Sequence, residues 1–308
     1  MSISRSILLW ASENKWMRKN VPSFGFVKSA IKKFMPGEKL EDALDAAQKF
    51  KTVNTPTIFT KLGENITDLS EGLVVRDHYL KLIDQVAERN LDIEISLKLT
   101  QLGFDLSVDE TYERFKTITK KVNENLGNVI WIDMEGSAYT QTTIEFYKKI
   151  KNECENVGLC IQAYLYSTEK DIDNLLSVNP NIRLVKGAYK EARDIAFPNK
   201  KDVDNSYLRV SKMLMQTAKG KNVRVAFGTH DEDLINTIIN ESKYLGVPKD
   251  KIEFQMLYGI KTNFQNELVK LGYKLKVLIS YGDFWYPWYM RRLAERPSNV
   301  WFVLKNIF

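Results

Sequence analysis

Charged side chains stand at the ends of several short apolar runs in this 308-residue sequence. Lys98 lies in SLKLTQLG and Lys186 in RLVKGAY, while Asp133 and Glu135 close the run NVIWIDME. A lysine within an apolar run is costly to bury unless an anion pairs with it. We therefore treat both lysines as candidate functional residues, with a structural Lys98–Asp133 ion pair at the rim of the fold as the simpler alternative.

Two adjacent arginines, Arg291 and Arg292, follow the aromatic segment Trp285–Met290. Arg291 and Glu295 are four residues apart and could form a pair on a helix surface. Neighbouring guanidinium groups also make a planar clamp for a carboxylate. The residues alone predict an anionic small substrate, together with a flat aromatic cofactor over the same mouth.

Three chemistries fit such a set of residues. A lyase could form a Schiff base on Lys98 or Lys186. A metal-assisted aldolase could use Asp133, Glu135 and His230, although the chain has only two histidines and two cysteines. A bound flavin could accept hydride from an amine or amino acid. Spacing alone does not decide between these chemistries.

The elements that must position these residues follow from an alternation of short apolar runs with longer amphipathic runs. Strands are expected at 56–62, 92–100, 128–135, 159–166, 182–189, 223–230, 252–259 and 274–282. Helices are expected at 68–89, 109–125, 140–156, 168–178, 203–219, 231–245, 263–271 and 283–296. Ser107, with Glu110 three residues on, predicts one helix start, and Gly158 predicts a helix stop.

Eight strand–helix units predict an α/β protein with a distorted (β/α)8 TIM-like barrel. An open dinucleotide-binding sheet is the competitor, but Leu62–Asn65 after the first strand carries no G-x-G-x-x-G fingerprint. Active sites of such barrels form at the carboxyl ends of the strands, so the candidate residues are expected to meet there. We expect one domain over 1–308, with a helical arm at 1–50 and the barrel at 51–308.

The arm is basic and aromatic, with Glu13 as the only acid in the first 35 residues. It is expected to pack on the barrel, with contact to an anionic membrane face as the alternative. No signal-peptide pattern and no apolar stretch near 18 residues is visible, which predicts a cytoplasmic protein, peripheral on the inner face of the cell membrane in that alternative. The net charge is +6, but Lys and Glu are interspersed, so nucleic acid is not an expected partner.

Several segments together resemble the proline dehydrogenase family, at the length of its small monofunctional bacterial members. The matching segments are SLKLT (96–100), IDME (132–135), IQAYL (161–165), RLVKGAYK (183–190), GTHD (228–231), EFQMLYG (253–259) and MRRLAERP (290–297). The resemblance implies non-covalent FAD, no metal, and oxidation of L-proline to Δ1-pyrroline-5-carboxylate by hydride transfer to flavin N5. It further implies a quinone as electron acceptor and a pyrroline-5-carboxylate dehydrogenase as a partner.

The resemblance also assigns roles to residues. The catalytic residues would be Lys98, Asp133, Arg291 and Arg292. The substrate would contact Lys98, Tyr189, Leu257, Leu278, Trp288, Arg291 and Arg292. The flavin would contact Asp133, Met134, Gln162, Arg183, Lys186, Gly187, Ala188, Tyr189, Thr229, His230, Gln255, Arg292 and Glu295. Asp133 would help to orient Lys98, and Arg183 would lie near flavin N5.

Two positions depart from the family pattern. Leu278 and Trp288 replace tyrosines that line the proline ring in family members. The departures leave the carboxylate clamp intact and bear on the substrate, so hydroxyproline or another cyclic or N-substituted amino acid is the alternative to proline. A non-catalytic FAD-binding sensor is a second alternative.

Overall fold

Eight parallel strands close into a barrel in a computed structural model that describes residues 3–24, 27, 31–221 and 223–295. The strands are β1 (Thr57–Lys61), β2 (Ile93–Leu97), β3 (Ile130–Ile132), β4 (Val157–Gln162), β5 (Asn181–Val185), β6 (Arg224–Gly228), β7 (Glu253–Leu257) and β8 (Lys274–Tyr281). Each strand pairs with the next along the chain, and β1 closes on β8 from Thr57↔Val277 to Lys61↔Tyr281. The predicted barrel and its eight strands are confirmed.

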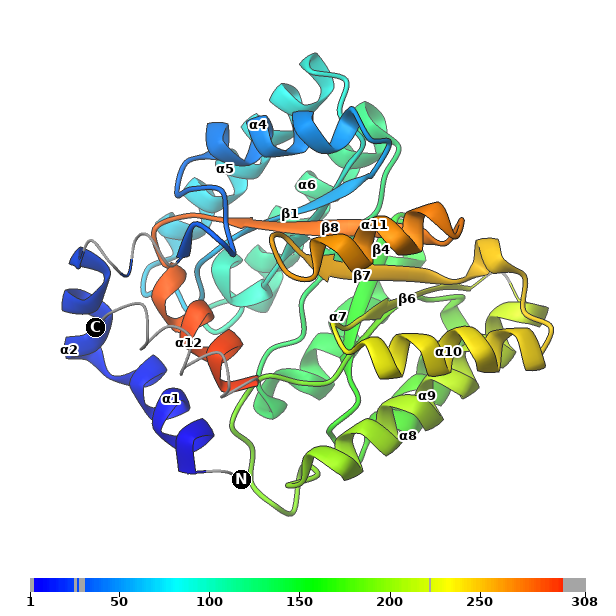
Figure 1. The fold of residues 1–308 in the computed structure, drawn as a ribbon. Helices are drawn as coiled ribbons and strands as arrows, with labels where there is room; N and C mark the ends of the chain where they lie inside the picture. Colours follow the sequence, from blue (N-terminus) through cyan, green and yellow to red (C-terminus); the bar gives the residue numbers. More distant parts are fainter. Residues whose placement is uncertain (1–2, 25–26, 28–30, 222, 296–308) are drawn as a thin grey trace.

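A helix follows every strand and covers the outside of the barrel (Figure 1). The helices are α5 (Leu69–Glu88), α6 (Val108–Leu126), α7 (Thr140–Glu153), α8 (Thr168–Leu175), α9 (Lys200–Gly220), α10 (Glu232–Tyr244), α11 (Thr262–Lys270) and α12 (Trp285–Glu295). Ser107 accepts a hydrogen bond from the Glu110 amide, which confirms the predicted start of α6. The barrel therefore has the strand–helix alternation that the sequence predicts.

The prediction that Gly158 stops a helix is wrong. The helix α7 ends at Glu153, and Gly158 lies in β4, paired with Trp131 of β3. A Cβ atom at Gly158 would lie 2.4–2.9 Å from the Trp131 ring. The glycine is needed because a buried indole fills the space above it, which is a requirement of packing rather than of backbone conformation.

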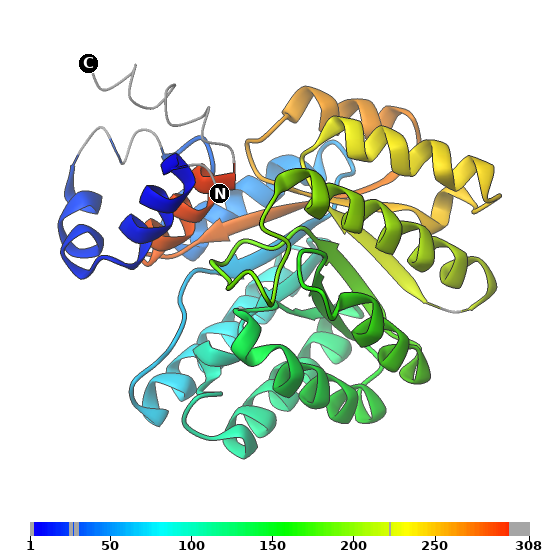
Figure 2. The same ribbon diagram turned by 90° about the horizontal axis from the view of Figure 1, so that it is seen from below.

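The first helix of the N-terminal segment packs on the last helix of the chain, whereas the helix before β1 packs on β8 and β1. Its helices are α1 (Ile3–Glu13), α2 (Lys15–Asn20) and α4 (Leu40–Lys51), and α1 lies against α12 in both ribbon views (Figures 1 and 2). A separate apolar cluster joins the two, with Leu8, Met35 and Trp285 among its buried members. The arm therefore closes one side of the barrel mouth, next to the helix that carries both arginines.

Candidate active site

A carboxylate of the chain itself lies between Lys98 and Arg291, two of the three cations that were expected to bind the substrate carboxylate. Lys98 Nζ lies 2.8 Å from Glu64 Oε2, and Arg291 Nη1 lies 3.1 Å from Glu64 Oε1. Glu64 follows β1, Lys98 follows β2 and Arg291 lies on α12, so three elements meet at the carboxyl ends of the strands. The side chains are 10–15% exposed. The two cations therefore form a half-closed site that binds one carboxylate.

The pKa values of two acidic side chains beside Lys98 are shifted in opposite directions. Burial alone would raise the pKa of Glu64, but Lys98 and Arg291 overcome it and lower that pKa to about 2. Burial raises the pKa of Glu135 to about 7, against the opposing charge of Lys98 and two hydrogen bonds from Thr100. Thr100 donates from its amide at 3.2 Å and from Oγ1 at 2.7 Å. At neutral pH the site therefore holds one fixed anion and one group that gains or loses a proton readily.

Tyr189 covers the clamp from the segment after β5. The Arg291 guanidinium lies 5.2 Å from the centre of the Tyr189 ring. The segment turns at Gly187, whose φ of +110° is open to glycine almost alone. A Cβ atom there would also lie 2.2–2.6 Å from the Tyr164 ring. Gly187 thus lets the chain pass close to Tyr164 and bring Tyr189 to Arg291.

Glu191 fastens the same segment to two other loops. Its Oε1 accepts hydrogen bonds from the Ser137 amide at 2.8 Å and from Tyr164 Oη at 3.2 Å, and Ser137 Oγ donates to its Oε2. The loops after β3, β4 and β5 are therefore tied together at one carboxylate. This contact holds the turn that carries Tyr189.

Arg183 is the most deeply buried cation at the mouth, with 3% of its side chain exposed. Its Nη2 lies 2.6 Å from both Asp133 Oδ1 and Ser96 Oγ. Asp133 therefore orients Arg183. The predicted Lys98–Asp133 ion pair is wrong, because the described partner of Lys98 among the acids is Glu64. Closure of β2 against β3 places Asp133 over Ser96 rather than towards the loop after β2.

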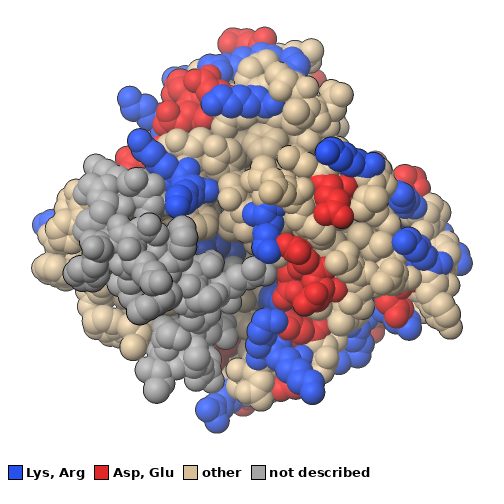
Figure 3. Space-filling view, in the orientation of Figure 1, with Lys and Arg blue, Asp and Glu red and all other residues tan. Residues whose placement is uncertain are grey.

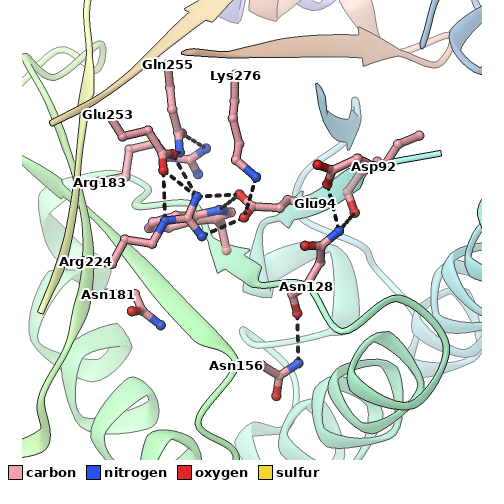
Figure 4. A network of polar contacts seen from close by, with 12 residues as sticks. Asp92, Glu94, Asn128, Asn156, Asn181, Arg183, Arg224, Glu253, Gln255 and Lys276 are labelled. Atoms are coloured by element: carbon pink, nitrogen blue, oxygen red, sulfur yellow. Dashed lines mark hydrogen bonds and ion pairs between the residues drawn. The ribbon is translucent and has the colours of Figure 1, made fainter. Parts of the chain in front are cut away.

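Further polar groups lie next to Arg183 inside the barrel (Figure 4). Gln255 accepts from Arg183 Nη1 at 3.3 Å and donates to Glu253 at 2.7 Å. Glu253 and Glu94 both bind Arg224. Gln255 thus links Arg183 to Glu253.

Lys186 forms ion pairs with two aspartates. Its Nζ lies 2.6 Å from Asp204 and 3.0 Å from Asp231. Thr229 Oγ1 accepts from the Asp231 amide at 3.2 Å, and the Leu257 amide donates to His230 Nε2 at 3.4 Å. The ends of β5, β6 and β7 are therefore joined along one side of the mouth.

The remaining predicted residues do not gather in one place. Gln162 is buried and donates at 3.5 Å to the carbonyl of buried Met134, and its Oε1 atom has no hydrogen-bond partner among the described residues. Leu278 packs on Ile58 and Trp131 inside the barrel. Trp288 and Leu257 belong instead to the apolar cluster between the arm and α12. Ala188 and Arg292 are partly buried, and the side chain of Glu295 lies outside the described residues.

Sequence reasoning missed Glu64, Ser96, Tyr164 and Glu191. Glu64 carried a signal, because it is an acid three residues past the end of a strand. The hypothetical metal ligands Asp133, Glu135 and His230 are not brought together, and within the described ranges no three metal-ligating side chains are grouped for an ion. In the same part of the chain, no helix combines the length and the apolar character that a membrane span requires.

Known proteins match this chain along most of its length. The proline dehydrogenase family model matches residues 43–305. The chain is 36% identical to proline dehydrogenase 2 of Bacillus subtilis subsp. natto over 307 residues, which is 100% of this chain and 99% of the relative. It is 34% identical to the proline dehydrogenase of Deinococcus radiodurans over 282 residues, 89% of each chain.

A solved structure shares the fold. The crystal structure of proline utilization A from Bdellovibrio bacteriovorus, inactivated by N-propargylglycine, superposes with a TM-score of 0.79 at 24% identity. It covers 96% of this chain, and this chain spans 38% of that one. The family model and the curated relatives assign this barrel to the oxidoreductase class of enzymes. The chain belongs to the proline dehydrogenase family, as its motifs indicated.

Proposed function

We propose that this protein oxidises L-proline to Δ1-pyrroline-5-carboxylate with FAD as the hydride acceptor and a quinone as the final acceptor. One observation carries the proposal: Lys98 and Arg291 converge on a single carboxylate at the barrel mouth. A free amino acid presents the same group. The substrate carboxylate would displace Glu64 and take its two ion pairs.

The residues at the mouth fit a flavin. The Gln162 Oε1 atom is buried and finds no hydrogen-bond partner in the part of the chain that the structure describes, which is costly unless a ligand donates to it. A flavin ring carries such a donor beside its carbonyl groups. Arg183 supplies a fixed positive charge nearby, one strand along from Gln162. Lys186 adds a second cation towards the phosphate side, although Asp204 and Asp231 already share its charge.

The mechanism follows from what the side chains hold in place. A bound flavin supplies a two-electron acceptor for hydride. Lys98 and Arg291 fix the substrate carboxylate, and Tyr189 limits how the ring can tilt. Arg183, held in place by Asp133, stabilises negative charge that develops at the acceptor. Glu135 is suited to take up a proton released by the amine near neutral pH, because burial raises its pKa to about 7.

Leu278 and Trp288 favour one alternative substrate class. Both lack a hydroxyl, and Trp288 is buried in the cluster under α12. Leucine is smaller than tyrosine, so Leu278 leaves more room inside the barrel for a substituent on the ring. Hydroxyproline or another cyclic or N-substituted amino acid is therefore the second candidate, and a non-catalytic flavin sensor is the third.

The arm offers a route to a lipid-soluble quinone. Trp10 and Trp16 are 58% and 66% exposed, and Lys15 and Lys19 are exposed beside them. Exposed indoles among lysines suit an anionic membrane surface. We include peripheral binding there in the proposal, and expect a Trp10→Ser/Trp16→Ser variant to sediment less with anionic liposomes. Equal sedimentation would refute it. A pyrroline-5-carboxylate dehydrogenase would consume the product.

The experiment is an absorption spectrum followed by anaerobic titration with L-proline and, in parallel, trans-4-hydroxy-L-proline. Bleaching of a flavin spectrum by L-proline supports the proposal. Bleaching by trans-4-hydroxy-L-proline but not by L-proline supports the alternative substrate. A flavin spectrum that neither amino acid bleaches favours the non-catalytic sensor. Absence of flavin after reconstitution with FAD overturns the proposed function.

A further inference from the structure

A layer of four charged side chains fills the base of the barrel, on the amino-terminal side of Arg183. Glu94, Arg224, Glu253 and Lys276 lie near the starts of β2, β6, β7 and β8 (Figure 4). The side chains of Glu94 and Glu253 are 1% and 5% exposed. Two anions and two cations meet there, so the layer has no net charge.

The contacts within the layer are short and numerous. Arg224 Nη1 lies 2.6 Å from Glu94 Oε1, and Lys276 Nζ lies 3.0 Å from the same oxygen. Arg224 Nη2 lies 2.8 Å from Glu253 Oε1. Burial alone would raise the pKa of Glu94, but Lys276 and Arg224 hold that pKa below its usual value. Glu94 therefore remains charged at neutral pH.

Stability alone does not account for this layer. The interior of such barrels is commonly filled by branched apolar side chains. Replacing buried ion pairs with well-packed apolar residues is often neutral or stabilising, because the desolvation of the charges is expensive. The arrangement therefore points to a role in the chemistry above it.

Two connections join the layer to Arg183. Gln255 bridges Glu253 and Arg183, with contacts of 2.7 and 3.3 Å, which fixes its amide oxygen towards the arginine. The guanidinium groups of Arg183 and Arg224 each lie 5.1 Å from the centre of the Trp131 ring, and Trp131 Nε1 donates to Glu94 at 2.7 Å. Any change of charge in the layer acts directly on the surroundings of Arg183.

We propose that Glu94 and Lys276 are positioning residues that hold Arg183 in place and, through the net charge of the layer, set the reduction potential of the bound flavin. The inference rests on the proposed function. Hydride uptake adds negative charge to a flavin, so a more positive layer favours the reduced form and a more negative layer disfavours it. The sign of the effect must therefore follow the sign of the substitution.

Three variants test this relation. Lys276→Met makes the layer negative, Glu94→Gln makes it positive, and the double variant restores neutrality. We expect the reduced-to-oxidised ratio at fixed potential to fall about tenfold in Lys276→Met, or ~30 mV for a two-electron couple. It should rise in Glu94→Gln and return close to wild type in the double variant. Lys212→Met is the matched control, because Lys212 pairs with one acid on an outer helix.

The measurements are the flavin potential by dye-coupled spectral titration and folding by circular dichroism. Potentials that follow the charge of the layer while Lys212→Met stays unchanged support the inference. Equal potentials in all folded variants overturn it and leave the layer purely structural, even where stability falls. If Glu94→Gln fails to fold, the flavin potential of Lys276→Met compared with that of Lys212→Met decides whether the inference holds. Wild-type protein that binds no flavin overturns the proposed function itself.

Discussion

Replacing Glu64 with glutamine removes the anion that Lys98 and Arg291 share in the structure. The pKa of Glu64 is lowered from 4.5 to about 2. One pKa unit corresponds to ~1.36 kcal/mol, so the ionised carboxylate stabilises the fold by about 3 kcal/mol at pH 7. The Glu64→Gln variant should lose that amount.

The dependence on pH gives the sharper test. A carboxyl group whose pKa is lowered by folding contributes stability that is present above its unfolded value of 4.5 and is lost as pH falls towards 2. The difference between wild type and variant should therefore stay near 3 kcal/mol from pH 7 to pH 5, and fall to about 1.4 kcal/mol at pH 3.

Urea unfolding without substrate, at each pH, measures this difference. Glu232→Gln is the control, because Glu232 pairs with Lys261 while both side chains are 41% exposed. Such an exposed pair should contribute less than about 1 kcal/mol. A loss below about 1 kcal/mol for Glu64→Gln at pH 7, or a loss that does not change down to pH 3, would refute the reasoning.

Three further predictions concern the same mouth. Glu135→Gln should stabilise the protein, because the pKa of Glu135 is raised to about 7 and its ionisation opposes folding as pH rises above 4.5. In urea unfolding, the free energy of unfolding should rise by up to about 3 kcal/mol at pH 8 and almost not at all at pH 4. A stabilisation that becomes smaller as pH rises would contradict this prediction. Gly187→Ala should lower the free energy of unfolding by about 2 kcal/mol or more and lower FAD retention, because φ is +110° and the added Cβ atom would clash with Tyr164. Gly220→Ala is the control, because a Cβ atom there meets open space and stability should change little. Equal melting temperatures for the two variants would argue against the contact with Tyr164. Lys98→Met should reduce kcat/KM for L-proline roughly 10- to 100-fold through KM, as expected for one charge-assisted hydrogen bond, and an unchanged KM in steady-state assays would exclude Lys98 from the clamp.

Local pattern was enough to predict the barrel. Alternation of short apolar runs with amphipathic runs determines where strands and helices form, and eight repeats leave few ways to cover a parallel sheet. Gly158 shows the limit of such reading. It looks like a helix stop in the chain, but its place is decided by the Trp131 ring on the neighbouring strand.

The members of the site were only partly predictable. Lys98 and Asp133 stood out because a charge near the end of a strand is unusual, and Arg291 stood out because it adjoins a second arginine after an aromatic run. Their partners did not, because Asp133 was the acid considered as a partner for Lys98, and Glu64 was not among the candidates. Ion pairing at the mouth depends on which loops meet after the barrel closes, and loops carry little periodic signal.

The amino-acid pattern is sufficient to predict the strand–helix order, the end of the barrel at which the candidate site lies, and, through several motifs in one order, the family. Which charges meet depends on how the barrel closes. Glu64 is 34 residues from Lys98 and 227 residues from Arg291, yet one carboxylate binds both. Secondary structure follows from side-chain period over a few residues, whereas electrostatic pairing follows from distances that exist only once the chain has closed on itself.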